Sequence, residues 1–264
     1  MIGPKDTGVG TSITANNEGG TLVPEYPLYA EEVQRVEKIR LFCLPYAGGS
    51  SLFYTDLKAY LNPSIELCPI DLAGHGMRMG EGLNTTMDQA LNDVFGQMEK
   101  VGFDQPFALL GYSMGASIAY YLYFYLKERG QVPQHVYFMA NTPPYVPDDD
   151  VPASDLPDDE FLDQLAALGG LSQEVLECKE LVDLFLPIMR ADVRLEEGSL
   201  ASDPSTIDCN MSVIYSTQDD EGGQVEQWKR CAGRLCDFHR FEGTHFFMLD
   251  HYPEVAEIIN RTLH

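Results

Sequence analysis

The sequence lacks a long hydrophobic run and is poor in basic residues. No apolar stretch in its 264 residues approaches the ~20 residues that are needed to cross a bilayer. Lys and Arg together number 17, against 41 Asp and Glu, and the formal net charge is −24. Because phosphate backbones are bound through clustered Lys and Arg, this balance argues strongly against nucleic acid as a partner. The sequence therefore predicts a protein that binds neither membrane nor nucleic acid.

A secretory leader and a disulfide framework are also missing. Residues 1–20 are polar and glycine-rich, without the apolar core of a signal peptide, and we expect them to form a flexible tail. The six cysteines are scattered and several lie in apolar runs, which favours buried free thiols. Cys231, Cys236 and His239 match no zinc spacing, so no metal site is expected there. Free thiols are typical of a reducing, cytoplasmic compartment.

Short apolar runs alternate with helical patterns along most of the chain. Strands are predicted at 39–45, 65–72, 107–111, 135–141, 209–216 and 237–243. Helices are predicted at 52–61, 87–101, 116–129, 224–233 and 253–263. Strands that are apolar nearly throughout and alternate with helices indicate a mostly parallel sheet that is covered on both faces. The predicted fold class is therefore α/β.

One acidic segment departs from this alternation. Residues 143–204 show helical periodicity, and Pro187 is expected to kink or break the second long helix. Within it, the stretch 148–203 holds 16 acidic and three basic residues, a balance of −13. A helical insertion between late strands can cover the carboxyl ends of the sheet, where ligands bind in α/β proteins. We therefore predict a core of 21–142 and 205–264 and a helical lid subdomain of 143–204.

Ser113 stands between two glycines at the junction of a predicted strand and a predicted helix. Residues 111–115, GYSMG, fit the pattern G-x-S-x-G, which is weak by itself. A strand directly before it and a helix directly after it are the context of a nucleophile elbow. Such a turn projects the hydroxyl above the sheet and directs the N–H groups of the helix start to the same point. Ser113 is the predicted nucleophile, and the alternative is a Gly-Ser turn that merely begins a helix.

A serine nucleophile needs a base and an acid that orients the base. His245 follows the last predicted strand, and the chain order Ser, acid, His in α/β-hydrolases puts the base last. His75, in a glycine loop after an earlier strand, is the weaker candidate. Asp219 and Asp220 both follow the preceding strand, and Asp219 is favoured as the acid.

The same chemistry needs two oxyanion donors. The first is predicted to be the backbone N–H of Met114, the residue after the nucleophile. The second is predicted to be that of Ala47, in the loop "PYAGGS" after the first central strand. Gly48 and Gly49 would let this backbone come close to a substrate. Losing one such donor typically lowers the rate by ~100- to 1,000-fold.

From about Ile39 to the C-terminus, the chain resembles a known family. The motifs "LPYAGGS", "FALLGYSMGA", "LGGLSQEVL", "LPIMRAD" and "FEGTHFFML" occur in this order in the type II thioesterases of non-ribosomal peptide and polyketide synthases. The medium-chain acyl carrier protein thioesterases are their relatives. "LPIMRAD" is the most discriminating, because generic lipases and esterases do not share it. The chain differs from the family at His75, where the family often has Arg, and at Ser216, where it usually has Gly.

The resemblance implies an α/β-hydrolase fold with a mobile helical lid. It implies an editing role, in which acyl groups are hydrolysed from the phosphopantetheine arm of an acyl or peptidyl carrier protein. No metal or cofactor is implied, because phosphopantetheine belongs to the substrate. Carried onto this chain, Ser113 is the nucleophile, His245 the base, Asp219 the orienting acid, and Ala47 and Met114 the oxyanion donors.

Three other readings remain open, and so does the docking surface. A carboxylesterase or lipase and an acyltransferase could use the same residues, and a hydrolase-fold binding protein would use none. Carrier proteins are usually acidic like this chain, so bulk attraction cannot guide the encounter. The hypothesis is that the carrier docks on apolar surface or on local bases, with Lys179, Arg190 and Arg194 as candidates. We expect a monomer.

Overall fold

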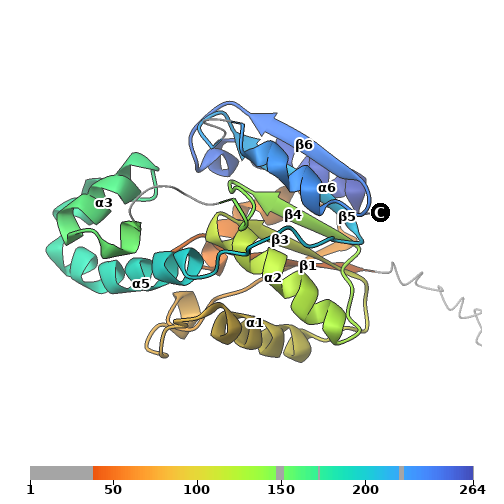
Figure 1. Cartoon of the computed structure of the whole chain (residues 1–264), viewed down its shortest axis with the longest axis horizontal. Coiled ribbons are helices and arrows are strands. Elements are labelled where there is room, and N and C mark those ends of the chain that lie inside the picture. The colour runs from red at the N-terminus through yellow and green to blue at the C-terminus, as the bar shows by residue number, and fades with distance from the viewer. Residues whose placement is uncertain (1–37, 147–151, 172, 220–222, 264) are drawn as a thin grey trace, which may run out of the picture. The chain divides into compact units, whose positions relative to one another are not determined.

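A six-stranded parallel sheet forms the centre of the molecule, with the strand order β2-β1-β3-β4-β5-β6 (Figure 1). The computed structural model describes residues 38–146, 152–171, 173–219 and 223–263. The strands are β1 Ile39–Leu44, β2 Ile65–Pro69, β3 Phe107–Tyr112, β4 His135–Met139, β5 Asn210–Ser216 and β6 Cys236–Phe241. All five neighbouring pairs are parallel. The predicted α/β fold is confirmed, and each predicted strand is present.

The sheet is buried on both faces because its strands are apolar on both. Successive side chains of a strand point to opposite faces. Phe42 and Leu44 of β1 therefore join one core cluster, which includes residues of α1 (Met87–Val101) and α2 (Met114–Glu128). Leu41 and Cys43 join the other, which includes residues of α6 (Tyr252–Thr262). Figure 1 shows α1 and α2 on one side of the sheet and α6 on the other.

Two of the predicted helices are tighter than expected. The segment 52–61 forms two 3₁₀ turns, η1 Ser51–Tyr54 and η2 Asp56–Tyr60. The segment 224–233 forms a 3₁₀ helix, η5 Val225–Cys231. An i, i+3 spacing of apolar residues suits either kind of helix, and short connectors often adopt the 3₁₀ form. The longer α1 begins as predicted, where the Thr86 hydroxyl accepts a hydrogen bond from the Gln89 N–H at 3.3 Å.

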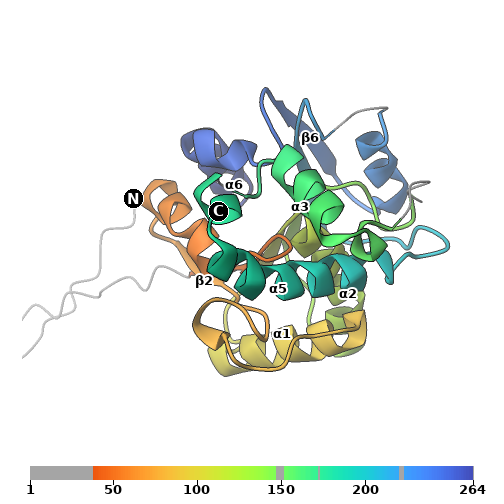
Figure 2. The same cartoon turned by 90° about the vertical axis from the view of Figure 1, so that its left-hand side faces the viewer.

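The segment between β4 and β5 is helical, as predicted. It carries α3 Asp158–Ala167, α4 Gln173–Glu177 and α5 Lys179–Glu197, which we call the α3–α5 segment. Figure 1 shows α3 and α5 beyond one end of the sheet, and Figure 2, which is viewed from that side, shows them in front of it. α5 runs on through Pro187, so of the predicted kink or break the break does not occur. A proline removes one helical N–H donor, and here the remaining hydrogen bonds and packing maintain the helix.

The described residues after Val36 belong to one compact unit. The predicted tail, 1–20, lies outside the described residues. Within the described part of the chain, no helix is both long enough and apolar enough to span a membrane.

Candidate active site

Ser113 occupies a strained turn between β3 and α2. Its φ of 53° and ψ of −123° lie in a region that residues other than glycine rarely adopt. A Cβ on Gly111 would lie 2.0 Å from the Gly115 carbonyl oxygen, and a Cβ on Gly115 would lie 2.2 Å from the Leu44 carbonyl oxygen. The sharp turn therefore requires both glycines, and the geometry is that of the predicted nucleophile elbow.

The structure brings the three predicted triad residues together at the carboxyl ends of three strands. The Nε2 atom of His245 lies 3.0 Å from Ser113 Oγ, and its Nδ1 atom lies 2.6 Å from Asp219 Oδ1. Ser113 follows β3, Asp219 follows β5 and His245 follows β6. Because parallel strands end at one edge of the sheet, residues far apart in the chain converge there. Asp220, the alternative acid, lies outside the described residues.

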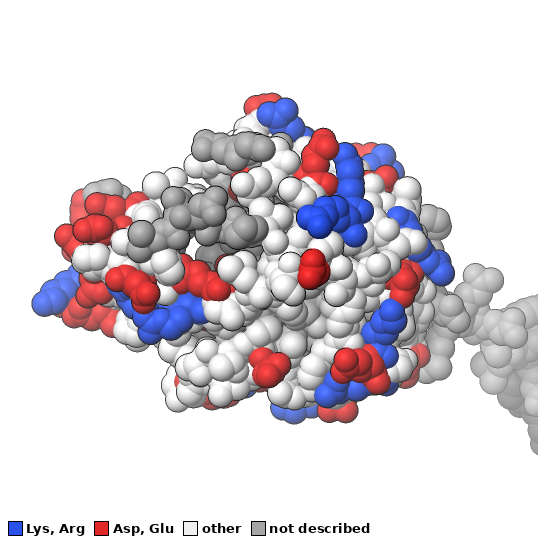
Figure 3. All heavy atoms as spheres, viewed as in Figure 1, with Lys and Arg blue, Asp and Glu red and all other residues white. Residues whose placement is uncertain are grey.

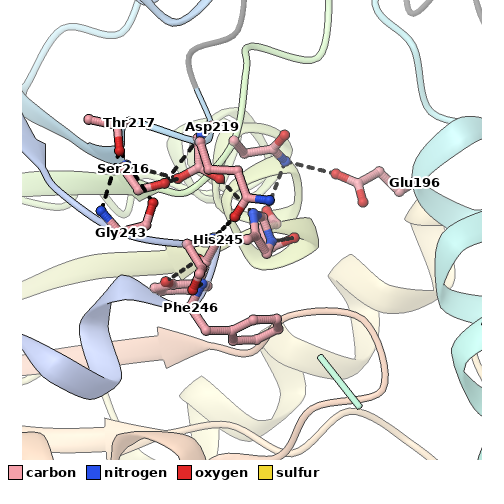
Figure 4. A network of polar contacts seen from close by, with 12 residues as sticks. Glu196, Ser216, Thr217, Asp219, Gly243, His245 and Phe246 are labelled. Atoms are coloured by element: carbon pink, nitrogen blue, oxygen red, sulfur yellow. Dashed lines mark hydrogen bonds and ion pairs between the residues drawn. The ribbon is translucent and has the colours of Figure 1, made fainter. Parts of the chain in front are cut away.

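The carboxylate of Asp219 is held by the turn that precedes it (Figure 4). Its Oδ2 atom accepts hydrogen bonds from the backbone N–H of Ser216 at 2.9 Å and from the Ser216 hydroxyl at 2.8 Å. This leaves Oδ1 directed at His245. Ser216 thus orients the predicted acid through two hydrogen bonds that the sequence did not predict.

Two further contacts fix the backbone of His245. Its N–H donates to the Gln218 side-chain oxygen at 2.9 Å, and its carbonyl accepts from the Tyr112 hydroxyl at 2.6 Å. Gln218 stands next to the acid and Tyr112 next to the nucleophile. The loop that carries His245 is therefore hydrogen-bonded both to the loop that carries Asp219 and to the residue before Ser113. Neither contact was predicted.

The loop of residues 45–50, after β1, lies against the start of α2. Leu44 pairs with Gly111 in the sheet, and the missing side chain of Gly115 leaves room for the carbonyls of Leu44 and Pro45. This loop carries Ala47, and α2 begins with Met114. Both predicted oxyanion donors thus belong to backbone segments that flank Ser113, and their role stays a prediction.

The α3–α5 segment contacts the site at three points. The first contact is made by Gly170, after α3, which packs on the ring of Phe246. A Cβ on Gly170 would lie 3.3 Å from this ring. Met189 of α5 lies over Gly48, so that a Cβ there would stand 2.6 Å from Met189 Cγ. The third contact is made by Glu196, near the end of α5. The segment therefore covers the strand ends that carry the triad.

Glu196 is connected to the elbow through the amide of Asn141, and it also contacts Ser117 of α2. Its Oε1 atom accepts from the Ser117 hydroxyl and from the Asn141 amide, each at 2.8 Å. The Asn141 amide also donates to the Ser113 carbonyl at 2.8 Å. Burial raises the pKa of Glu196, and the hydrogen bonds from Ser117 and Asn141 oppose that rise. Sequence reasoning missed this network, because its members come from two helices and the segment after β4, which are far apart in the chain.

His75, the weaker candidate base, is engaged away from the nucleophile. Its Nδ1 atom lies 3.1 Å from the Ala73 carbonyl oxygen, and its Nε2 atom lies 2.8 Å from Asp192 Oδ2. The structure therefore brings His245 to Ser113, and it pairs His75 with the α3–α5 segment.

All six cysteines are free thiols, as the sequence predicted. In the described ranges, no group of three or more His, Cys, Asp or Glu side chains is arranged to hold a metal ion. Cys231 is buried, while Cys236 and His239 are partly buried.

A parallel sheet with a strained serine turn, a histidine after the last strand and a carboxylate after the preceding one defines an α/β-hydrolase. Residues 39–263 match the thioesterase domain family, and the chain therefore belongs to that family. It is a thioester hydrolase by family, and the resemblance drawn from its motifs is confirmed.

Three relatives illustrate the match. Linear gramicidin dehydrogenase LgrE from Brevibacillus parabrevis is 28% identical over 246 residues, which are 91% of this chain and 93% of LgrE. The crystal structure of ClbQ, from the colibactin NRPS/PKS pathway, is 30% identical with a TM-score of 0.80, covering 86% of this chain and 97% of ClbQ. The structure of the type II thioesterase BorB, from the borrelidin cluster, is 26% identical with a TM-score of 0.77, covering 86% of this chain and 93% of BorB.

Proposed function

We propose that this protein is a type II thioesterase that releases acyl groups from the phosphopantetheine arm of a synthase carrier protein. The observation that carries the proposal is the contact of His245 with both Ser113 and Asp219. The membership of the thioesterase family and the likeness to BorB and ClbQ support the substrate class.

The reaction begins at Ser113. Its Oγ atom attacks the thioester carbonyl carbon while His245 Nε2 takes the hydroxyl proton. Asp219 holds the imidazole through Nδ1 and stabilises its protonated form. The developing oxyanion accepts hydrogen bonds from the Ala47 and Met114 N–H groups.

The intermediate then collapses and water completes the cycle. The carbon–sulfur bond breaks, and the pantetheine thiol leaves with the proton held by His245. This step needs little assistance, because the pKa of a free thiol is ~8.5. His245 next takes a proton from water, which attacks the acyl-Ser113 ester. The products are a carboxylic acid and the regenerated serine.

The α3–α5 segment serves as the lid over this reaction. It contacts the site near Phe246, Gly48 and Asn141, three positions that surround the elbow. A cover of this kind excludes water and selects the acyl group. The proposed lid thus corresponds to the segment predicted from residues 143–204.

The contacts of the two lid arginines distinguish between the residues that were predicted to dock the carrier protein. Arg190 donates to Asp158 at 2.7 Å and to two backbone carbonyls, and it stacks on the Phe161 ring. Arg194 pairs with Asp155 at 3.5 Å, and its side chain is 61% exposed. Figure 3 shows acidic and basic side chains interspersed over the part of the surface where α3 and α5 lie. We therefore favour the two exposed residues, Arg194 and Lys179, over Arg190 as carrier contacts.

A dehydrogenase activity, which the name of LgrE includes, gains no support from this site. The dinucleotide pattern G-x-G-x-x-G does not occur anywhere in the 264 residues. The serine, histidine and carboxylate contacts are those of acyl transfer.

The test is Ser113→Ala with an acyl carrier protein loaded with a panel of acyl groups, followed by mass spectrometry. We expect release by the native chain and a loss of roughly 10⁶-fold in the variant, as for other serine hydrolases. Ser202→Ala, at an exposed position, is the matched control and should release acid at the native rate. Retained release by folded Ser113→Ala would exclude Ser113 as the nucleophile. Faster hydrolysis of p-nitrophenyl esters than of acyl-pantetheine would favour the carboxylesterase alternative.

A further inference from the structure

Asp192 of α5 reaches across the site to the loop of residues 45–50, which we now call the oxyanion loop. Its Oδ2 atom accepts from the backbone N–H of Gly48 at 2.7 Å and lies 2.8 Å from His75 Nε2. Asp192 is 2% exposed and His75 is 4% exposed. The N–H that follows the proposed donor Ala47 is therefore held by a buried carboxylate of the lid.

The oxyanion loop is held at Gly48 and at the adjoining Ser51 by two different parts of the molecule. Just past the loop, the N–H of Ser51 donates to Asp71 Oδ1 at 2.6 Å, and Asp71 follows β2 in the core. Gly48 is held from the lid, through a residue 144 positions away. Only the Gly48 contact depends on where α5 lies.

α5 also packs directly on this point of the loop. Gly48 has a φ of +75°, and a Cβ there would stand 2.6 Å from Met189 Cγ. Met189 and Asp192 lie three residues apart, on one face of α5. A displacement of α5 would thus remove both the packing and the acceptor of the Gly48 N–H.

His75 makes both of its ring contacts with acceptors. The Ala73 carbonyl can only accept, and so can an ionised Asp192. Both contacts are hydrogen bonds when Nδ1 and Nε2 each carry a proton, which is the imidazolium form. A neutral His75 would turn a lone pair toward one of these oxygens.

We propose that Asp192 is a positioning residue for the oxyanion loop, and that protonated His75 holds Asp192 in place. The oxyanion hole is then completed only when the lid helix α5 is seated. This inference rests on the proposed hydrolysis through Ser113, because the loop is assigned its role there.

The charged groups around His75 define the direction of the pH effect. Burial lowers the pKa of His75, but the hydrogen bond to Asp192 and the charges of Asp192 and Asp71 outweigh this, and the net pKa is raised. Arg78, three residues after His75, is already paired with Asp93 at 2.8 Å. Because the pKa is raised, the contact is intact at the ordinary pKa of ~6.5 and is lost as the pH rises further. Deprotonation should loosen Asp192 and lower kcat on the alkaline side.

The test compares kcat, KM and the pH profile of four variants on an acyl-pantetheine substrate. Asp192→Asn should lower kcat at least about tenfold and less than the ~1,000-fold limit for a lost oxyanion donor. KM should stay within about twofold of the native value, because the ground state gains nothing from the oxyanion hole. His75→Gln should lower kcat at neutral pH. His75→Arg, which carries a cation that does not titrate, should remove the alkaline decline.

Asp155→Asn is the matched control. It removes an exposed lid carboxylate whose ion pair is with Arg194 and not with the oxyanion loop. Its kcat and pH profile should equal those of the native chain. Far-UV circular dichroism and thermal unfolding establish that each variant is folded. Labelling of Ser113 by a fluorophosphonate gives a second readout that needs no thioester.

Two results would overturn the inference: a folded Asp192→Asn variant with native kcat, or the same alkaline decline in His75→Arg as in the native chain. A native chain that is labelled at Ser113 but releases no acyl group from a loaded carrier protein would instead contradict the proposed function. The labelling rate of Asp192→Asn would then still test the positioning role, since the phosphonyl oxygen occupies the same hole.

Discussion

Ser216 lies fully buried at the end of β5, where its hydroxyl adds a second donor to the carboxylate of Asp219. The backbone N–H of Ser216 supplies the first donor, and a glycine in its place would keep only that one. The Ser216 hydroxyl also accepts from the Asp219 N–H at 3.2 Å. A hydrogen bond to a charged group contributes about 1.5–3 kcal/mol, so this serine stabilises the turn that carries the acid.

Replacing Ser216 by Ala should therefore weaken the fold and the reaction together. We expect a loss of about 1–2 kcal/mol in the free energy of unfolding, measured by urea denaturation, because the Asp219 carboxylate keeps its backbone donor. We expect kcat to fall by about threefold to tenfold, since Asp219 orients His245 less firmly. Ser216→Gly should behave similarly. A variant with native stability and native kcat would show that the hydroxyl is dispensable.

At this scale, the sequence was sufficient for residues that carry a local signal. Ser113, His245 and Asp219 each follow a predicted strand in a recognisable turn, and the structure brings the three together. Gln218 and Glu196 carried no such signal, because each finds its partner on another element. Their contacts depend on how the elements pack, which periodicity does not report.

At the scale of elements, the β3–α2 turn leaves less room for a Cβ atom than any other described glycine position. The start of α2 approaches the end of β1 so closely that Gly115 has no room for a side chain. The atom in the way is the Leu44 carbonyl oxygen, a backbone atom of a central strand, which cannot rotate aside.

Gly115→Ala should therefore destabilise the protein by about 3 kcal/mol or more, as overpacking against a fixed backbone does. Gly96→Ala is the matched control, since a Cβ there meets nothing within 4 Å and Gly96 lies inside α1. It should stabilise the protein by ~0.5–1 kcal/mol, through the higher helix propensity of alanine. Thermal or urea unfolding measures both changes. Equal effects of the two substitutions would contradict the steric explanation.

The predicted elements differ from the observed ones where one sequence pattern is compatible with two kinds of secondary structure. Strands were predictable because their apolar runs are short and are bounded by turn signals, and these two features together separate a buried strand from a buried helix. The 3₁₀ segments at Ser51–Tyr54 and Val225–Cys231 were predicted as α-helix, since apolar spacing alone does not separate the two. Pro187 does not end α5, although a break was one of the two outcomes predicted for it, because tertiary packing keeps the helix continuous past it.

At the scale of the whole molecule, two buried histidines give the stability opposite pH dependences. Asp192 and Asp71 hold the pKa of His75 above its ordinary value despite its burial, so its contribution is present at low pH and is lost as the pH rises. Burial and the nearby His239 lower the pKa of His135 to about 4. Below the ordinary pKa of ~6.5, the unfolded chain binds a proton at His135 that the folded chain does not. Stability therefore falls with decreasing pH until about pH 4.

His135→Gln should remove the second of these effects. In the native chain, His135 on β4 lies 2.9 Å from the Ser212 hydroxyl on β5, a contact that a glutamine amide can replace. Between about pH 7 and pH 5, the native chain should lose about 2 kcal/mol more of its unfolding free energy than the variant does. Urea unfolding at both pH values measures the difference, in which the other titrating groups cancel. Parallel pH dependences in the two proteins would contradict the lowered pKa.

The parallel order of the sheet also has a consequence for synthesis of the chain. Parallel strands cannot pair through a tight hairpin, so each pairing waits for the connecting segment to be made. β6 is the last strand and lies at the sheet edge, and His245 comes four residues after it ends. A nascent chain on the ribosome carries its serine for more than a hundred residues before the imidazole that activates it has been polymerised. The triad can therefore assemble only after the chain has been made as far as His245, which lies just before the last helix α6.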